Sequence, residues 1–196
     1  MRVPVSVLAS VVAALLLGPA AAPARAATDA GPDPAGDQLS RRADGQGPPL
    51  RPARTHRAGD IIDNSVSFGT DVVVVTRYRA FARNGYTLFR WNLKTVDQKG
   101  PPYWTALLEV KAGKDQGVFT LADPIANPVT CGGAVLDRTA RTVTLTIPPT
   151  CLNDPSWVRV GNGSAVFNGV REYWDDARLD GTVKGAWKLG PALTRS

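Results

Sequence analysis

CGGAVLDRTARTVTLTIPPTCLNDPSWVRV, residues 131–160, contains the only two cysteines of the chain, with a hairpin pattern between them. Two runs of alternating apolar and polar residues, 129–136 and 141–147, lie on either side of a polar turn, a pattern typical of antiparallel strands. Pro148 and Pro149 end the second run, and a further run begins at Ser156. The stretch therefore predicts a small β-domain whose hairpin is clasped to the loop that follows it.

The two cysteines, Cys131 and Cys151, are expected to form a disulfide. Disulfides form in oxidising compartments, and an even number of cysteines leaves no thiol unpaired. A metal site is the alternative, but the segment offers neither a second pair of ligands nor a nearby histidine. Closing a loop of about 20 residues would stabilise the fold by roughly 3 kcal/mol.

Similar short runs continue through the rest of the chain after Asp60. Asn84 and Gly85 are a strong hairpin signal, and the next run places Phe89, Trp91 and Leu93 on one face. Strands are expected at residues 60–68, 70–81, 86–96, 103–111, 117–121, 129–136, 141–147, 156–160 and 164–168. With no amphipathic helix pattern, residues 60–196 are predicted to form one all-β domain. Its expected architecture is an antiparallel β-sandwich, jelly-roll or immunoglobulin-like, with one disulfide.

Residues 1–26 have the pattern of an export signal. Arg2 precedes an apolar run over residues 3–17, and Ala24 and Ala26 frame an A-x-A cleavage site. A retained membrane helix or a buried core helix are the alternatives. The apolar run is short for a span of about 20 residues, and small residues follow it. We therefore expect a secreted, extracellular protein with no membrane span after signal removal.

Residues 27–59 differ in composition from the β-domain, because Gly, Pro, Asp and Arg dominate and large apolar residues are almost absent. Such a segment buries little apolar surface, so it is interpreted as a linker or an irregular strap over a domain edge.

The formal charge of the chain is +6, and loss of Arg2 and Arg25 with the signal lowers it to +4. The basic residues form no stripe, so nucleic acid is not an expected partner.

Several short motifs resemble those of small secreted actinobacterial proteins that have no assigned activity. The matching elements are Asp33-Pro34-Ala35-Gly36-Asp37, Asp60-Ile61, the pair Cys131 and Cys151, Cys151-Leu152-x-x-Pro155-x-Trp157-Val158-Arg159-Val160, Asp175-Asp176-Ala177, Asp180-Gly181 and Leu189-Gly190-Pro191. The layout is also similar, more weakly, to β-sandwiches of the DOMON and carbohydrate-binding-module type. The resemblance implies export and a β-sandwich, and it implies no activity.

Two groups of aspartates are candidate calcium ligands. The first group is Asp33 and Asp37, which together with Asp29 recur every four residues in the Gly- and Pro-rich strap. The second group is Asp175, Asp176 and Asp180. Calcium takes six to eight oxygen ligands, usually carboxylates together with backbone carbonyls. The resemblance to binding modules implies a structural calcium where terminal segments meet. Alternatively, these aspartates only cap turns and keep the surface soluble. No cofactor is required on either interpretation.

Two aromatic pairs, Tyr103-Trp104 and Tyr173-Trp174, are candidate ligand-binding residues. Neighbours on a strand point to opposite faces, so one member of each pair is expected to face outward. Exposed rings can stack on sugars or form a protein interface, whereas Trp91 and Trp157 are expected in the core.

Catalysis has little support in the sequence. His56 is the only histidine and lies in the strap, where it is expected to be exposed and idle, and Glu109 and Glu172 are the only glutamates. No phosphate-binding loop, H-E-x-x-H or G-x-S-x-G motif occurs. The predicted function is non-catalytic binding of an extracellular polymer, either a glycan or a cell-wall component. The alternatives are a structural or protein-interaction domain and, with less support, a carboxylate-dependent hydrolase.

Overall fold

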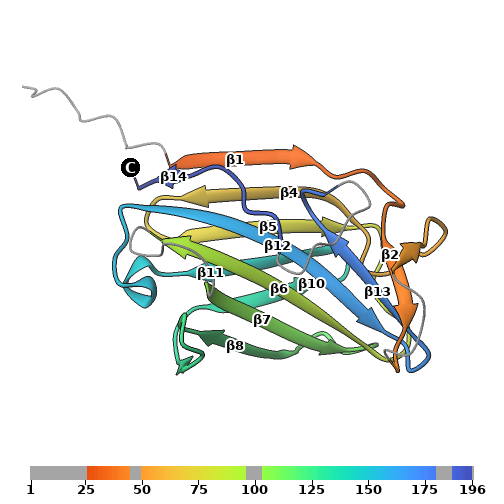
Figure 1. Cartoon of the computed structure of the whole chain (residues 1–196). Coiled ribbons are helices and arrows are strands. Elements are labelled where there is room, and N and C mark those ends of the chain that lie inside the picture. The colour runs from red at the N-terminus through yellow and green to blue at the C-terminus, as the bar shows by residue number, and fades with distance from the viewer. Residues whose placement is uncertain (1–25, 45–49, 96–102, 180–186, 196) are drawn as a thin grey trace, which may run out of the picture.

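The computed structural model describes residues 26–44, 50–95, 103–179 and 187–195. These residues form two antiparallel β-sheets that pack against each other (Figure 1). The short 3-10 turn η1 (Pro149–Leu152) is the only helical element among them, and it is too short to cross a membrane. Cys131 and Cys151 are joined by a disulfide. The predicted antiparallel β-sandwich with one disulfide is thus confirmed.

Fourteen strands make up the two sheets within the described residues. Sheet A has the order β1 (Ala27–Pro32), β4 (Ile61–Phe68), β5 (Val72–Tyr78), β11 (Thr142–Ile147) and β10 (Gly133–Asp137). Sheet B has the order β3 (Arg51–Pro52), β2 (Leu39–Arg42), β13 (Arg171–Asp176), β12 (Trp157–Phe167), β6 (Tyr86–Thr95), β7 (Trp104–Lys111), β8 (Val118–Ala122) and β9 (Pro128–Val129), and β14 (Leu193–Thr194) pairs with the start of β12.

The segment predicted to be an irregular strap is partly regular. It supplies β1 to the edge of sheet A, next to β4, and β2 and β3 to the edge of sheet B, next to β13. The prediction is wrong for these residues because an edge strand is held by backbone hydrogen bonds along one side and needs few apolar side chains. The strap therefore links the outer strands of both sheets.

The C-terminal part of the sandwich also differs from the expected strands. The runs at 156–160 and 164–168 form one continuous strand, β12, which pairs with β6 along its length from Val158 to Phe167. No range was predicted for strand β13, although Tyr173 and Trp174 were expected to lie on a strand, and β13 pairs with the second half of β12. A long central strand of this kind can carry glycines such as Gly161 and Gly163 because neighbouring strands and the C-terminal segment cover them.

Alternating side chains of both sheets form the core. Phe89, Trp91 and Leu93 of β6 point inward as predicted and pack with buried valines and leucines of sheet A. Trp157 was expected in the core but is only half-buried at the start of β12. Towards the other end of β12 the core becomes polar, where the Asn162 amide donates to Thr76 Oγ1 at 3.0 Å.

The two ends of the sandwich have different connections. At one end, which we call the clasp end, the disulfide joins the segment before β10 to η1. The opposite end, which we call the turn end, carries the β5–β6 and β10–β11 connections and the β12–β13 hairpin. The polar part of the core lies towards the turn end.

Candidate functional site

Three of the predicted calcium ligands come together near the turn end. Each of Asp33, Asp37 and Asp175 offers a carboxylate oxygen within 4.8 Å of the others. The strap makes this possible, because it leaves sheet A after β1, turns, and enters sheet B as β2 beside β13. Residues about 140 positions apart in the chain thereby meet. We call these three residues the acidic cluster.

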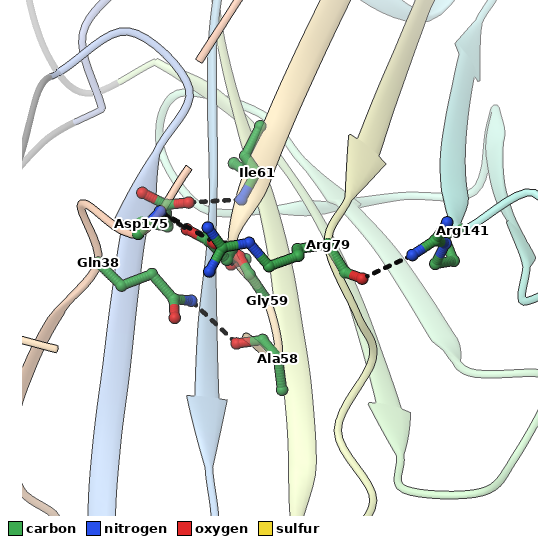
Figure 2. A network of polar contacts seen from close by, with 10 residues as sticks. Gln38, Ala58, Gly59, Ile61, Arg79, Arg141 and Asp175 are labelled. Carbon is green, nitrogen blue, oxygen red and sulfur yellow. Dashed lines mark hydrogen bonds and ion pairs between the residues drawn. The ribbon is translucent and has the colours of Figure 1, made fainter. Parts of the chain in front are cut away.

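Asp175 of the acidic cluster belongs to a network of polar contacts (Figure 2). Asp175 is 2% exposed, and its Oδ2 accepts a hydrogen bond from the Ile61 backbone N–H at 2.6 Å. The fully buried Asp60 accepts from the Gly36 N–H at 3.0 Å and pairs with the Arg79 guanidinium at 2.9 Å. Burial raises the pKa of Asp175 well above its usual value, and neighbouring Asp33 raises it further.

These carboxylates are too close to one another in a buried site to be ionised together without compensation. A shared proton or a bound cation would relieve this mutual repulsion. Carboxylate oxygens are the hard donors that calcium prefers, and its remaining ligands would come from backbone carbonyls or water.

Not all the predicted acidic ligands join the acidic cluster. Asp176 lies on the opposite face of β13, where it accepts hydrogen bonds from the backbone N–H groups of Lys188 and Arg178 at 2.8 and 3.1 Å. Burial raises its pKa to about 6. The prediction that it shares a site with Asp175 is wrong, because successive residues of a strand point to opposite faces. Asp29 pairs with Arg178, and Asp180 lies outside the described residues.

The predicted aromatic pairs do not form two ligand platforms. Trp104 is 6% exposed and belongs to the core, so its assignment to an exposed platform is wrong. Its inward orientation follows from the alternation along β7, and Tyr103 lies half-buried just before that strand.

Tyr173 stacks on His56 with ring centroids 3.5 Å apart. This contact half-buries the histidine that was expected to be idle, and burial lowers its pKa.

Trp174 points to the outer face of sheet B, where it joins two rings that the sequence did not single out. Phe167 stacks on Tyr86 at a centroid distance of 4.6 Å and meets Trp174 edge-on at 6.0 Å. All three side chains are half-buried, so each keeps part of its surface in solvent. We call Tyr86, Phe167 and Trp174 the aromatic row. It crosses three neighbouring strands, β6, β12 and β13.

Polar side chains fix the Trp174 end of the aromatic row. The Glu172 carboxylate accepts hydrogen bonds from Trp174 Nε1 at 3.1 Å and from Arg41 Nε at 2.7 Å. The Arg41 guanidinium lies 5.6 Å from the centroid of the Trp174 ring, which places it in cation–π range. Burial raises the pKa of Tyr86, and the nearby carboxylates of Glu109 and Glu172 raise it further.

The sequence contained a signal for part of this row. The alternation along β6 that places Phe89 and Trp91 inward necessarily places Tyr86 outward, and the pairing of Tyr86 with Phe167 completes the stack. Comparison with protein-family models, with curated proteins and with solved structures finds no match for this chain.

Proposed function

We propose that this protein is a secreted, non-catalytic domain that binds an extracellular glycan through the aromatic row. The observation that carries the proposal is the contact of three partly exposed rings across adjacent strands of one sheet face. A sugar ring has an apolar face that can pack on an aromatic ring, and a row of rings on a flat sheet suits successive units of a polymer. Exposed apolar surface of this kind marks binding sites when it is contiguous and bordered by polar groups.

The neighbouring polar groups support the same proposal. Glu172 and Arg41 hold the Trp174 ring in one orientation, so less conformational entropy is lost on binding. On β6, the outward side chains of Arg90 and Asn92 hydrogen-bond to each other at 3.2 Å. Asn92 is only 2% exposed, so the half-buried Arg90 is the member of this pair that can offer donors to sugar hydroxyls on the face that carries the aromatic row.

Replacing Trp174 by alanine is expected to weaken binding to a polysaccharide by tenfold or more. Loss of a large aromatic contact costs about 1.5–3 kcal/mol, and a factor of ten corresponds to about 1.4 kcal/mol. The measurement is retention on insoluble polysaccharides, followed by titration calorimetry with soluble oligosaccharides from the polymer that retains the protein. Trp174→Phe keeps a ring and should keep most of the affinity.

Tyr103→Ala is the matched control, because Tyr103 lies near the end of β7 opposite to Lys111, which pairs with Tyr86. It should bind like the original protein. Failure of the folded protein to bind any tested polysaccharide would refute the proposal. Equal losses in Trp174→Ala and Tyr103→Ala would place the binding surface elsewhere.

The alternatives have less support from the geometry. A glycosidase needs two carboxyl groups about 5–10 Å apart across the bond to be cleaved. The backbones of Glu109 and Glu172 lie on β7 and β13, three strand spacings or roughly 14 Å apart. Moreover, Glu172 is engaged by Arg41 and Trp174.

A structural or protein-interaction domain would use the same outer face without a sugar. The polysaccharide assay separates this role from glycan binding.

We also propose a structural calcium at the acidic cluster, supported by the convergence of Asp33, Asp37 and Asp175 in a buried site. A ligand that binds only the folded state at one hundred times its dissociation constant stabilises it by about 2.7 kcal/mol. Calcium should therefore raise the melting temperature measured in EDTA by several degrees. Because Asp175→Asn removes one charged ligand, it should largely abolish this response.

Asp176→Asn is the control for this calcium experiment, since Asp176 is adjacent in sequence but lies on the other face of β13. That variant should respond to calcium like the original protein. An unchanged melting temperature on adding calcium to the EDTA-treated original protein would contradict a stabilising calcium site.

A further inference from the structure

A groove lined by arginines lies at the turn end of the sandwich. It consists of two adjoining hollows of about 350 and 570 Å³, both lined by Arg57, Arg79 and Arg83. The larger hollow is also lined by Arg138 and Arg141. Among the described residues, no carboxylate side chain lines either hollow. We call this feature the arginine groove.

Backbone contacts hold the arginine groove in shape. Residues 79–83 connect β5 to β6 and lie between the strap and the β10–β11 turn. The Arg79 N–H donates to the Asp60 carbonyl at 2.7 Å, and Ala58 forms a bridge with Ala80. On the other side, the Arg141 carbonyl accepts from the Tyr78 N–H at 2.8 Å, and the Arg141 guanidinium donates to the Arg79 carbonyl at 3.1 Å (Figure 2). The backbones of three segments are therefore held against one another, and each segment carries arginines of the groove.

Only part of this positive charge is compensated within the fold. Arg79 pairs with Asp60 and Arg138 pairs with Asp115, each at 2.9 Å. In contrast, Arg57, Arg83 and Arg141 are exposed and form no salt bridge with a described residue. Like charges gathered in a concave surface concentrate the local potential and attract an anion.

We infer that the arginine groove binds the anionic groups of an acidic polysaccharide. The planar guanidinium fork matches the oxygens of a carboxylate or phosphate, and it forms charge-assisted hydrogen bonds with them. Two adjoining hollows, each in the size range of ligand sites, suit consecutive anionic units better than a single small ion. This site differs from the aromatic row in position and chemistry, and the inference does not depend on glycan binding at that row.

The aromatic rings of the arginine groove favour a polysaccharide over a nucleic acid. Binding of single-stranded nucleic acid uses aromatic side chains on which successive bases stack. Phe81 and His56 line the groove, but each ring is already engaged. The Arg138 guanidinium lies 5.7 Å from the Phe81 centroid, and His56 stacks on Tyr173. The groove therefore offers mainly charge and hydrogen-bond donors.

The test measures binding of the intact protein to polygalacturonate, which carries carboxylates, and to phosphomannan, a polysaccharide that carries phosphates. At least one should bind at low salt, and binding should weaken as salt rises. Arg57→Ala and Arg83→Ala should each weaken binding about tenfold, the effect of losing one charge-assisted hydrogen bond of about 1.5 kcal/mol or more. Both residues are exposed, so the variants should fold, which melting curves would verify.

Arg195→Ala is the control, because it removes the same charge from the clasp end, where the exposed Arg195 guanidinium pairs with Asp154 at 3.3 Å. It should bind like the original protein. An equal loss in Arg195→Ala would mean general attraction to a basic surface and would overturn the inference. Absence of binding to both polymers, or tighter binding to DNA than to either, would also overturn it. Trp174→Ala should leave binding of both polyanions unchanged, which separates this site from the aromatic row.

Discussion

Replacing Gly85 by alanine is expected to lower the free energy of unfolding by about 3 kcal/mol or more. Gly85 has a φ of +72°, a conformation that costs other residues roughly 1–2 kcal/mol. A Cβ at this position would also lie 1.7 Å from the Phe167 carbonyl oxygen, so the β12–β13 hairpin would have to move. Forcing extra atoms into a packed site typically costs about 1–3 kcal/mol. Urea denaturation followed by tryptophan fluorescence measures the change.

Gly113→Ala separates these two contributions. Gly113 has nearly the same φ, +75°, but no atom lies within 4 Å of an added Cβ. This variant should lose only the conformational part, about 1–2 kcal/mol. Equal losses in the two variants would show that the approach of Phe167 to Gly85 contributes nothing to stability. Because Phe167 belongs to the aromatic row, Gly85→Ala should also weaken polysaccharide binding at temperatures where the variant is folded.

The sequence was sufficient to predict the sandwich because its central strands bury one face. Alternation in β6 and β11 reports which side chains point inward, and this alternation is a local property of the chain. The edge strand β1 has no such signal, since four of its six residues are exposed, the other two are half-buried, and its partner β4 supplies the hydrogen bonds. Whether Ala27–Pro32 forms a strand is decided by a segment more than 30 residues away.

The candidate sites were predictable only in part, for a related reason. The recurrence of Asp33 and Asp37 and the adjacent Asp175 and Asp176 suggested that two acidic segments meet. Selecting Asp175 rather than Asp176 requires knowing that this segment is a strand and which face it turns inward, and no range was predicted for β13. The contact of Tyr86 with Phe167 depends on the register between β6 and β12, which neither strand specifies alone.

The disulfide is expected to contribute about 3 kcal/mol, because it joins the two places where the chain passes between the sheets at the clasp end. Cys131 follows β9 of sheet B and precedes β10 of sheet A, whereas Cys151 lies in η1 between β11 of sheet A and β12 of sheet B. The bond closes a loop of 20 residues, and the unfolded chain loses the corresponding conformational freedom. Replacing both cysteines by alanine should therefore lower the midpoint of urea unfolding.

Reduction of the original protein provides the comparison for that double variant. Cys151 is buried in the core, so its replacement by alanine removes a sulfur from packing as well as the cross-link. The reduced protein loses only the cross-link and should be more stable than the double variant by up to about 1 kcal/mol. If reduction left the midpoint unchanged, the disulfide would not restrict the unfolded chain.

The disulfide and Gly85 lie at opposite ends of the sandwich, so their effects on stability should be independent. Combining Gly85→Ala with the double cysteine variant should lower the free energy of unfolding by the sum of the separate losses, within about 0.5 kcal/mol. Together these losses approach the whole stability of a typical domain of about 5–15 kcal/mol, so the cycle is best measured at low temperature. A smaller combined loss would mean that loosening the turn end already relaxes the clasp end, and the two sheets would then have to respond as one unit.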